Sequence, residues 1–237
     1  MSELAISLAF FDTAHGLSGT ARAGATLLFE GRQVRTLPEP PDLERDGDSF
    51  TAKLAGRIDL TFTPVSEAAA LPGSESWVCN VTGTAEGRSI ECLGTATVTS
   101  EPPAWAQLDS LRAVSAVIDR ETAVFLGARR PRSAPGHGDE LTNAVVISGG
   151  QALQVEDARL STVYDGEGRQ RTAGLELWMP GEDYPRRASG TATAGVSIEL
   201  GGVRVDAALF EWRMDGRTGP GAYELAVRED DEGAAAA

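Results

Sequence analysis

The stretch VRVDAALFEWRMDGRTGPGAYELAV (203–227) carries the pattern that decides the fold. Its first half alternates between two rows of side chains, one of which is Val203, Val205, Ala207, Leu209 and Glu211. Such an alternation is typical of a strand with one buried face. Asp215-Gly216 then marks a turn, and Gly219 and Gly221 are assigned to the same connection. The stretch therefore predicts two antiparallel strands joined by a glycine-rich turn.

The same period of two recurs along the whole chain. It is clearest in residues 5–10, 54–62, 114–118 and 196–200. Turn signals separate these segments, and the chain contains 27 Gly and 12 Pro. Regularly spaced short strands with turns between them favour an all-β sandwich or barrel. The helical signal is weak, and its best candidate is Val65–Leu71, about two turns long.

Composition narrows the classes of partner. The 237 residues suffice for one large β domain or two small ones. A net charge of −14 argues against nucleic acid and against anionic membranes, because both require a cationic surface. No apolar run is long enough for a membrane helix, and the N-terminus lacks the features of a signal peptide. We expect a cytoplasmic protein without membrane insertion, and the oligomeric state stays open.

An internal echo suggests two related units. Residues 82–92 read TGTAEGRSIEC and residues 189–200 read SGTATAGVSIEL, so both contain Gly-Thr-Ala, a small turn and then Ser-Ile-Glu. An offset near half the chain length is typical of a duplicated β unit. The expected division is an N-terminal unit over 1–104, a C-terminal unit over 105–228 and a disordered acidic and alanine-rich tail over 229–237.

The two cysteines flank a predicted hairpin turn at Glu86-Gly87. A two-residue turn there pairs Cys79 with residue 94 and Cys92 with residue 81, so the thiols are diagonal neighbours, too far apart for a disulfide. We expect two free, half-buried thiols. The cysteines and the two histidines, His15 and His137, show no metal-ligand spacing, so no metal site is predicted.

Three stretches together resemble the carotenoid-hydratase-like family, a broad group that includes AttH-like proteins, hydroxyneurosporene synthases and several natural-product cyclases. They are FFDTAHGLSGTARAGATLLFEGR (10–32), LSTVYDGEGRQRTAGLELWMPGEDYPRRASGTA (160–192) and FEWRMDGRTGPGAYE (210–224). The resemblance implies two tandem lipocalin-like β-barrel units packed together, a hydrophobic small-molecule cavity and chemistry without a redox cofactor. Residues 99–112 depart from the family, since they contain Trp105 and Arg112 but no histidine.

Two acids are the candidate catalytic residues. Glu211 ends an apolar row, and a desolvated carboxyl group there could act as a general acid; alternatively it lies in water or pairs with Arg213. Glu176 shares a strand face with Trp178, which faces either solvent or a partly polar interior. Asp12 and His15 form either an acid–base pair or a turn that Asp12 caps.

Aromatic residues are the candidate substrate contacts. Trp105, Trp178 and Trp212 could form walls around a polyene or stabilise a carbocation, or they could anchor the core. Tyr164, at a strand end before a turn, is also assigned to substrate binding. We expect a cofactor-free cyclase, isomerase or hydratase acting on a hydrophobic polyene, terpenoid or polyketide. The alternatives are a non-catalytic carrier of a lipophilic molecule and an interaction module with a packed interior.

Overall fold

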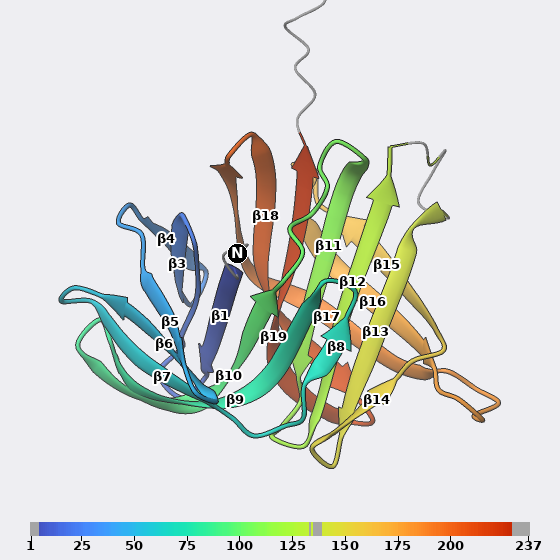
Figure 1. The fold of residues 1–237 in the computed structure, drawn as a ribbon, viewed down its shortest axis with the longest axis horizontal. Helices are drawn as coiled ribbons and strands as arrows, with labels where there is room; N and C mark the ends of the chain where they lie inside the picture. Colours follow the sequence, from blue (N-terminus) through green and yellow to red (C-terminus); the bar gives the residue numbers. More distant parts are fainter. Residues whose placement is uncertain (1–4, 133, 135–138, 229–237) are drawn as a thin grey trace, which may run out of the picture.

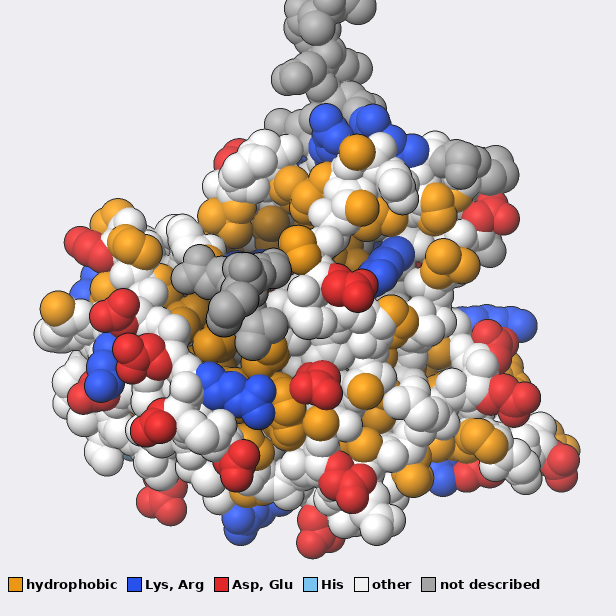
Figure 2. Space-filling model, in the orientation of Figure 1, with side chains coloured by type: hydrophobic (Ala, Val, Ile, Leu, Met, Phe, Trp, Pro, Cys, Tyr) orange, Lys and Arg blue, Asp and Glu red, His pale blue; other side chains and the backbone are white. Residues whose placement is uncertain are grey.

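The computed structural model describes residues 5–132, 134 and 139–228, which form nineteen strands and no α-helix (Figure 1). His137 and the predicted tail over 229–237 lie outside the described residues. No helix in these ranges is long and apolar enough to cross a bilayer. Acidic, basic and apolar side chains are interspersed on the face that Figure 2 shows. The all-β prediction is confirmed.

The N-terminal part of the chain forms one curled antiparallel sheet. Its order is β4-β3-β2-β1-β10-β9-β7-β6-β5, with the short β8 paired to β9. The strands are β1 Ala5–Asp12, β2 Leu17–Arg22, β3 Ala25–Glu30, β4 Gln33–Leu37, β5 Asp42–Asp46, β6 Ser49–Leu54, β7 Ile58–Pro64, β8 Ala69–Leu71, β9 Ser74–Ala85 and β10 Arg88–Thr99.

A second curled sheet follows, in the order β14-β13-β12-β11-β19-β18-β17-β16-β15. Its strands are β11 Leu108–Val117, β12 Thr122–Pro131, β13 Leu141–Ser148, β14 Gln151–Gln154, β15 Asp157–Tyr164, β16 Gln170–Trp178, β17 Arg186–Leu200, β18 Val203–Met214 and β19 Arg217–Arg228.

The two sheets repeat one order of strands, but the sequence echo does not mark it. In both sheets the first strand pairs with the last, and the last strand forms a hairpin with the strand before it. The turns of these two hairpins are Glu86-Gly87 and Asp215-Gly216, and all four residues have positive φ, as a type I′ turn requires. The echo instead aligns the first hairpin with residues 189–200, which lie in the single strand β17 and contain a bulge near Thr193 rather than the expected turn.

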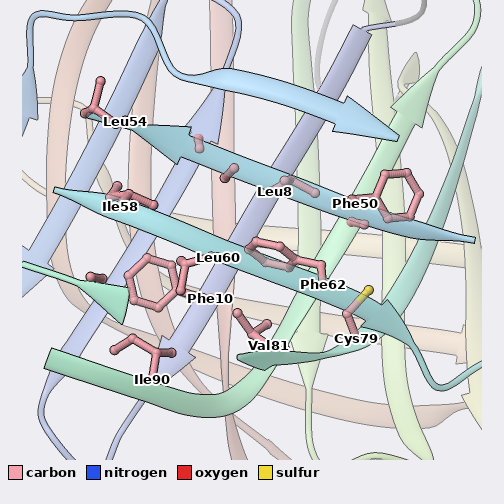
Figure 3. Packing of buried hydrophobic residues seen from close by; sticks show 14 of the residues in the cluster. Leu8, Phe10, Phe50, Leu54, Ile58, Leu60, Phe62, Cys79, Val81 and Ile90 are labelled. Atoms are coloured by element: carbon pink, nitrogen blue, oxygen red, sulfur yellow. The ribbon is translucent and has the colours of Figure 1, made fainter. Parts of the chain in front are cut away.

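Each sheet curls around its own apolar core. Figure 3 shows the first core, which contains Leu8 and Phe10 of β1, Phe50 of β6 and Phe62 of β7. The second core is built around Phe210, Trp212 and other apolar side chains of the second sheet. Because side chains alternate across a strand, the opposite rows face away from these cores.

A third apolar cluster joins the two sheets. It includes Phe11 and Phe29 from the first sheet and Phe125 and Leu209 from the second. The row of Ala207 and Leu209, which the sequence assigned to an interior, is therefore buried between the sheets rather than inside the second barrel. The sheets thus pack through the faces that their own cores leave free.

The helix predicted over Val65–Leu71 is wrong. The Val65 amide donates to the Val78 carbonyl at 2.8 Å, and residues Ala69–Leu71 form β8 beside β9. A helix of two turns is too short to be stable by its own hydrogen bonds. The edge of β9 supplies partners for the same backbone groups, so the segment is extended.

The glycines of 215–221 do not form one connection, as the sequence suggested. Only Gly216 lies in the turn, whereas Gly219 and Gly221 lie within β19. A Cβ on Gly221 would lie 2.0 Å from the Ser115 carbonyl oxygen and 2.8 Å from the Trp212 ring. Glycine is needed there because β11 and the indole approach the backbone closely.

The hairpin register around the cysteines is confirmed. Cys79 pairs with Gly94 and Cys92 with Val81, and both thiols are free. Cys92 is half-buried, as expected, whereas Cys79 is fully buried. Burial raises the pKa of Cys79 to about 12 and that of Cys92 to about 11.

We therefore expect both thiols to react slowly in the folded protein and fully after unfolding. The thiolate is the reactive form, and burial disfavours both ionisation and access. Alkylation with iodoacetamide at pH 8, followed by intact mass measurement, should show two adducts in denaturant without reductant. Fast double modification of the folded protein would contradict the burial of Cys79.

Candidate functional site

The interface between the sheets opens into a groove beside the β1–β2 turn. Its main part encloses about 930 Å³. A smaller pocket of about 370 Å³ adjoins it, and the two share Thr13, Ser18, Thr193 and Leu209. We call the two together the inter-sheet groove. Both sheets line it, so neither sheet alone could form it.

The groove combines apolar walls with ionisable groups. Phe29 and Leu209 belong to the cluster between the sheets and line its walls. Asp12 also lines the main part, and Glu211 lines the adjoining pocket. Three arginines complete the main part: Arg32, Arg169 and Arg171. Arg169 is paired with Asp165 at 3.2 Å. The hydrogen bond that the Arg169 backbone amide donates to Asp165 lowers the pKa of this carboxyl group most, and the Arg169 guanidinium lowers it further.

Glu211 is the predicted acid that lies in the groove. It continues the row of Ala207 and Leu209, as the parity of β18 indicated. Leu209 is the last member of this row in the apolar cluster between the sheets, and Glu211 lies beyond that cluster. There its side chain is exposed. Its neighbours across the pocket include Phe11 and Ser18 of the first sheet. Glu211 therefore belongs to the lining of the groove and has an exposed side chain.

Asp12 and His15 combine both interpretations of their spacing. The His15 amide donates to Asp12 Oδ1 at 3.1 Å, which caps the β1–β2 turn. The imidazole Nδ1 lies 2.6 Å from Asp12 Oδ2. The Asp12 side chain is 2% exposed and that of His15 is 54% exposed. A buried carboxylate thus holds a histidine that remains accessible.

Glu176 and Trp178 lie on the outward face of the second sheet. Leu175 precedes Glu176 and Leu177 lies between Glu176 and Trp178, and both leucines belong to the second core. Glu176 pairs with Arg187 at 3.0 Å, and the Arg159 guanidinium lies 4.8 Å from the centre of the Trp178 ring. Of the two orientations considered for this strand, the structure shows the outward one.

The other predicted aromatic contacts also lie away from the groove. Trp212 is fully buried in the second core and stacks on Phe210 at 5.3 Å between ring centres. Trp105 is half-buried in the connection between β10 and β11, where its carbonyl accepts a hydrogen bond from Arg228. Tyr164 lines a pocket of about 330 Å³ at one end of the second barrel.

This barrel-end pocket contains a buried polar network that the sequence did not identify. The Arg112 side chain is 6% exposed and forms an ion pair with Glu140, whose side chain is 3% exposed. Arg112 also donates to Thr162 Oγ1 at 3.2 Å and to Tyr223 OH at 3.5 Å. Burial raises the pKa of Tyr223 to about 12, so its hydroxyl keeps its proton as a donor.

A signal for this network is present in the sequence. Arg112 shares its parity with Val114, Ala116 and Ile118, so it is a charged residue in a buried row, as Glu211 seemed to be. The two cases differ in position along the strand. Arg112 lies within the barrel, whereas Glu211 lies where the interface between the sheets opens.

A second cavity, of about 280 Å³, lies farther along the interface. Hydroxyl groups of both sheets line it, from Ser7, Thr20, Ser76, Thr95, Thr97 and Ser115. Arg22 and Glu224 form an ion pair at its edge. Among the described residues, no group of three His, Cys, Asp or Glu side chains is arranged to hold a metal ion.

Solved structures resemble this fold across nearly the whole chain. One is a protein from Nitrosomonas europaea assigned provisionally as an AttH, with 13% identity, a TM-score of 0.61 and coverage of 94% of this chain and 91% of that one. Another is CghA, with 11% identity, a TM-score of 0.60 and coverage of 96% and 89%. No family model and no curated protein matches the sequence. The likeness confirms the two packed lipocalin-like units.

Proposed function

We propose that this protein binds a hydrophobic small molecule in the inter-sheet groove and acts on it as a cofactor-free cyclase, isomerase or hydratase. The observation that carries the proposal is the groove itself. Its main part, about 930 Å³, matches the size of small-molecule sites. Apolar side chains of both sheets line it, and the exposed side chain of Glu211 lies in the adjoining pocket. The apolar walls would contact the carbon skeleton of a polyene, terpenoid or polyketide, and the polar part of the lining, which includes Arg32 and Arg171, would meet its oxygen atoms or solvent.

In this proposal Glu211 is the general acid. Its carboxyl group is exposed at the pocket. A hydrophobic ligand lying between Leu209 and Phe11 would exclude water from the pocket and disfavour the charged form. The proton would then be available to an alkene, carbonyl or hydroxyl group of that ligand.

The exposure of Glu211 also supports the second candidate function, a carrier of a lipophilic molecule. A carrier uses the same apolar walls and needs no acid. Glu176 supplies none in the groove either, because it pairs with Arg187 on the outward face. The two functions share a binding site. An enzyme converts the ligand to a product, so replacing Glu211 slows that conversion, whereas a carrier releases the ligand unchanged with or without Glu211.

Blocking the groove should remove its ligand. Thr193 is exposed and lines both parts of the groove, so Thr193→Trp fills it without disturbing a buried core. We expect native mass spectrometry of freshly purified wild type to show a bound lipophile, and the variant to lose at least about 90% of it, since overlap with a ligand forfeits its contacts. Thr82→Trp, on an exposed part of β9, is the matched control. Equal occupancy in both variants would place the ligand elsewhere.

A further inference from the structure

We infer that His15, positioned by Asp12, is a general base at the rim of the inter-sheet groove and that the substrate is a carbonyl compound. The inference rests on the proposed function, because it uses the same groove. It adds a second group to the reaction, and it narrows the three substrate classes to the one whose C–H bonds an imidazole can ionise.

The Asp12–His15 contact determines which ring nitrogen is free to act. An ionised carboxylate can only accept hydrogen bonds, so Asp12 Oδ2, 2.6 Å from Nδ1, favours the tautomer with its proton on Nδ1. The lone pair then resides on Nε2, on the far side of the ring. The second contact, from the His15 amide to Asp12 Oδ1 at 3.1 Å, fixes the backbone that carries the ring.

Burial of Asp12 explains why the pair is held. Asp12 ends β1 in the row that begins with Leu8 and Phe10, so its side chain enters a position that the sheet buries. A buried carboxylate must be paired or hydrogen-bonded, and His15 provides both kinds of contact. Gly16, with φ 62°, closes the turn. Capping of the turn by Asp12 requires only the hydrogen bond from the His15 amide to Oδ1. The contact between Oδ2 and the imidazole is not needed for the cap.

The pair lies beside the groove rather than on a remote turn. Asp12, Thr13 and Gly16, which flank His15 in the chain, all line its main part. Thr13 also lines the adjoining pocket, where Glu211 lies. His15 itself lines neither part but lies on the turn between these residues, so a ligand that extends out of the groove past Thr13 would meet its exposed ring, while Glu211 lies in the adjoining pocket.

This placement suits a proton transfer that is neutral overall. Nε2 takes a proton from the carbon that lies between a carbonyl group and an alkene, and the C–H electron pair becomes a new π bond between that carbon and the near carbon of the alkene. The existing π bond shifts, and its far carbon receives the proton of Glu211. Solvent then returns the proton from His15 to Glu211. A neutral imidazole ionises carbon acids of this kind but not plain hydrocarbons, which favours polyketides over polyenes and terpenoids.

5-Nitrobenzisoxazole tests the base without knowledge of the natural substrate. A base removes the proton on C3, the C–H pair forms a nitrile, and the N–O bond breaks with its pair on the phenolate oxygen, which absorbs visible light. We expect wild type to accelerate this elimination and His15→Gln to lower the rate at least about 10-fold, since a positioned base contributes about 10²–10⁴-fold. His137→Gln, which changes the chain's other histidine, should leave the rate unchanged.

Binding measurements separate this inference from the proposed function. Equilibrium dialysis of the same probe should show equal binding in wild type and His15→Gln, and weaker binding in Thr193→Trp. Equal binding with an equal rate in His15→Gln would overturn the base and leave the groove intact. Absence of binding to wild type would overturn the groove assignment and the base together.

The role of Asp12 as a positioning residue has its own readout. Asparagine keeps an oxygen for the His15 amide but offers an NH₂ group, or a weaker acceptor, to the ring. Nitrogen-15 NMR of the imidazole should therefore show the Nδ1–H tautomer in wild type and a shift toward Nε2–H in Asp12→Asn. The same tautomer mixture in both proteins would overturn the assigned role of Asp12.

Discussion

Replacing Arg112 with methionine should lower the free energy of unfolding by about 3–5 kcal/mol. Arg112 and Glu140 are among the most buried charged side chains of the second barrel, with 6% and 3% exposure. Methionine preserves much of the volume but removes the guanidinium, so the Glu140 carboxylate loses that compensation in a medium that disfavours charge. Thr162 and Tyr223 lose a donor at the same time. Urea denaturation monitored by tryptophan fluorescence measures the change.

A surface pair provides the control for Arg112. Arg187 is 73% exposed in its pair with Glu176, so Arg187→Met should cost about 1 kcal/mol or less. Glu140→Gln combined with Arg112→Met should recover part of the loss, because it also removes the buried charge. If Arg112→Met and Arg187→Met cost the same, the network at the barrel end does not contribute the expected stability.

Replacing Glu211 with glutamine should reduce turnover of the bound lipophile by about 10²–10⁴-fold, with little change in its binding. Glutamine keeps the size and a hydrogen-bonding group but cannot donate the proton that the reaction needs. Glu211 lines the pocket with Phe11 and Leu209, and the ligand that covers these side chains would also desolvate the carboxyl group. Single-turnover measurements with product detection by mass spectrometry separate the chemical step from binding.

Glu176→Gln is the matched change outside the groove. Glu176 is held by Arg187 on the outward face, so its replacement should leave turnover within about twofold of wild type. Unchanged turnover in Glu211→Gln would exclude the general acid and favour the carrier or a reaction in which the groove only folds its substrate. A loss in Glu176→Gln alone would move the site to the outward face of β16.

Local patterns in the sequence were sufficient for most strands and for two of the hairpin turns. Period-two rows give strands whatever their partners are, because alternate side chains always point to opposite faces. Glu86-Gly87 and Asp215-Gly216 specify type I′ turns through their own φ preferences, and the first of them correctly set the register of the cysteines. Val65–Leu71 failed because its helical preference, over so few residues, is weaker than pairing with β9.

The candidate site depended on information that is not local. The alternation of β18 placed Glu211 in register with Leu209, but it could not say which of two apolar environments that row enters. Strand β18 has one face toward its own core and one toward the other sheet, and both faces are apolar. Trp212 thus became a core residue and Glu211 a groove residue, although they are adjacent.

The sequence by itself therefore determined most of the strands, the hairpin turns at Glu86-Gly87 and Asp215-Gly216, the free thiols and the pairing of residues around the cysteines, since these follow from alternation and from the φ preferences of single residues. The tertiary structure alone decided where charges are buried and where a groove opens. Arg112 meets Glu140 across 28 residues, and Asp12 and Glu211 line one groove although about 200 residues separate them. Such contacts depend on how two sheets are packed, and no short-range pattern encodes that packing.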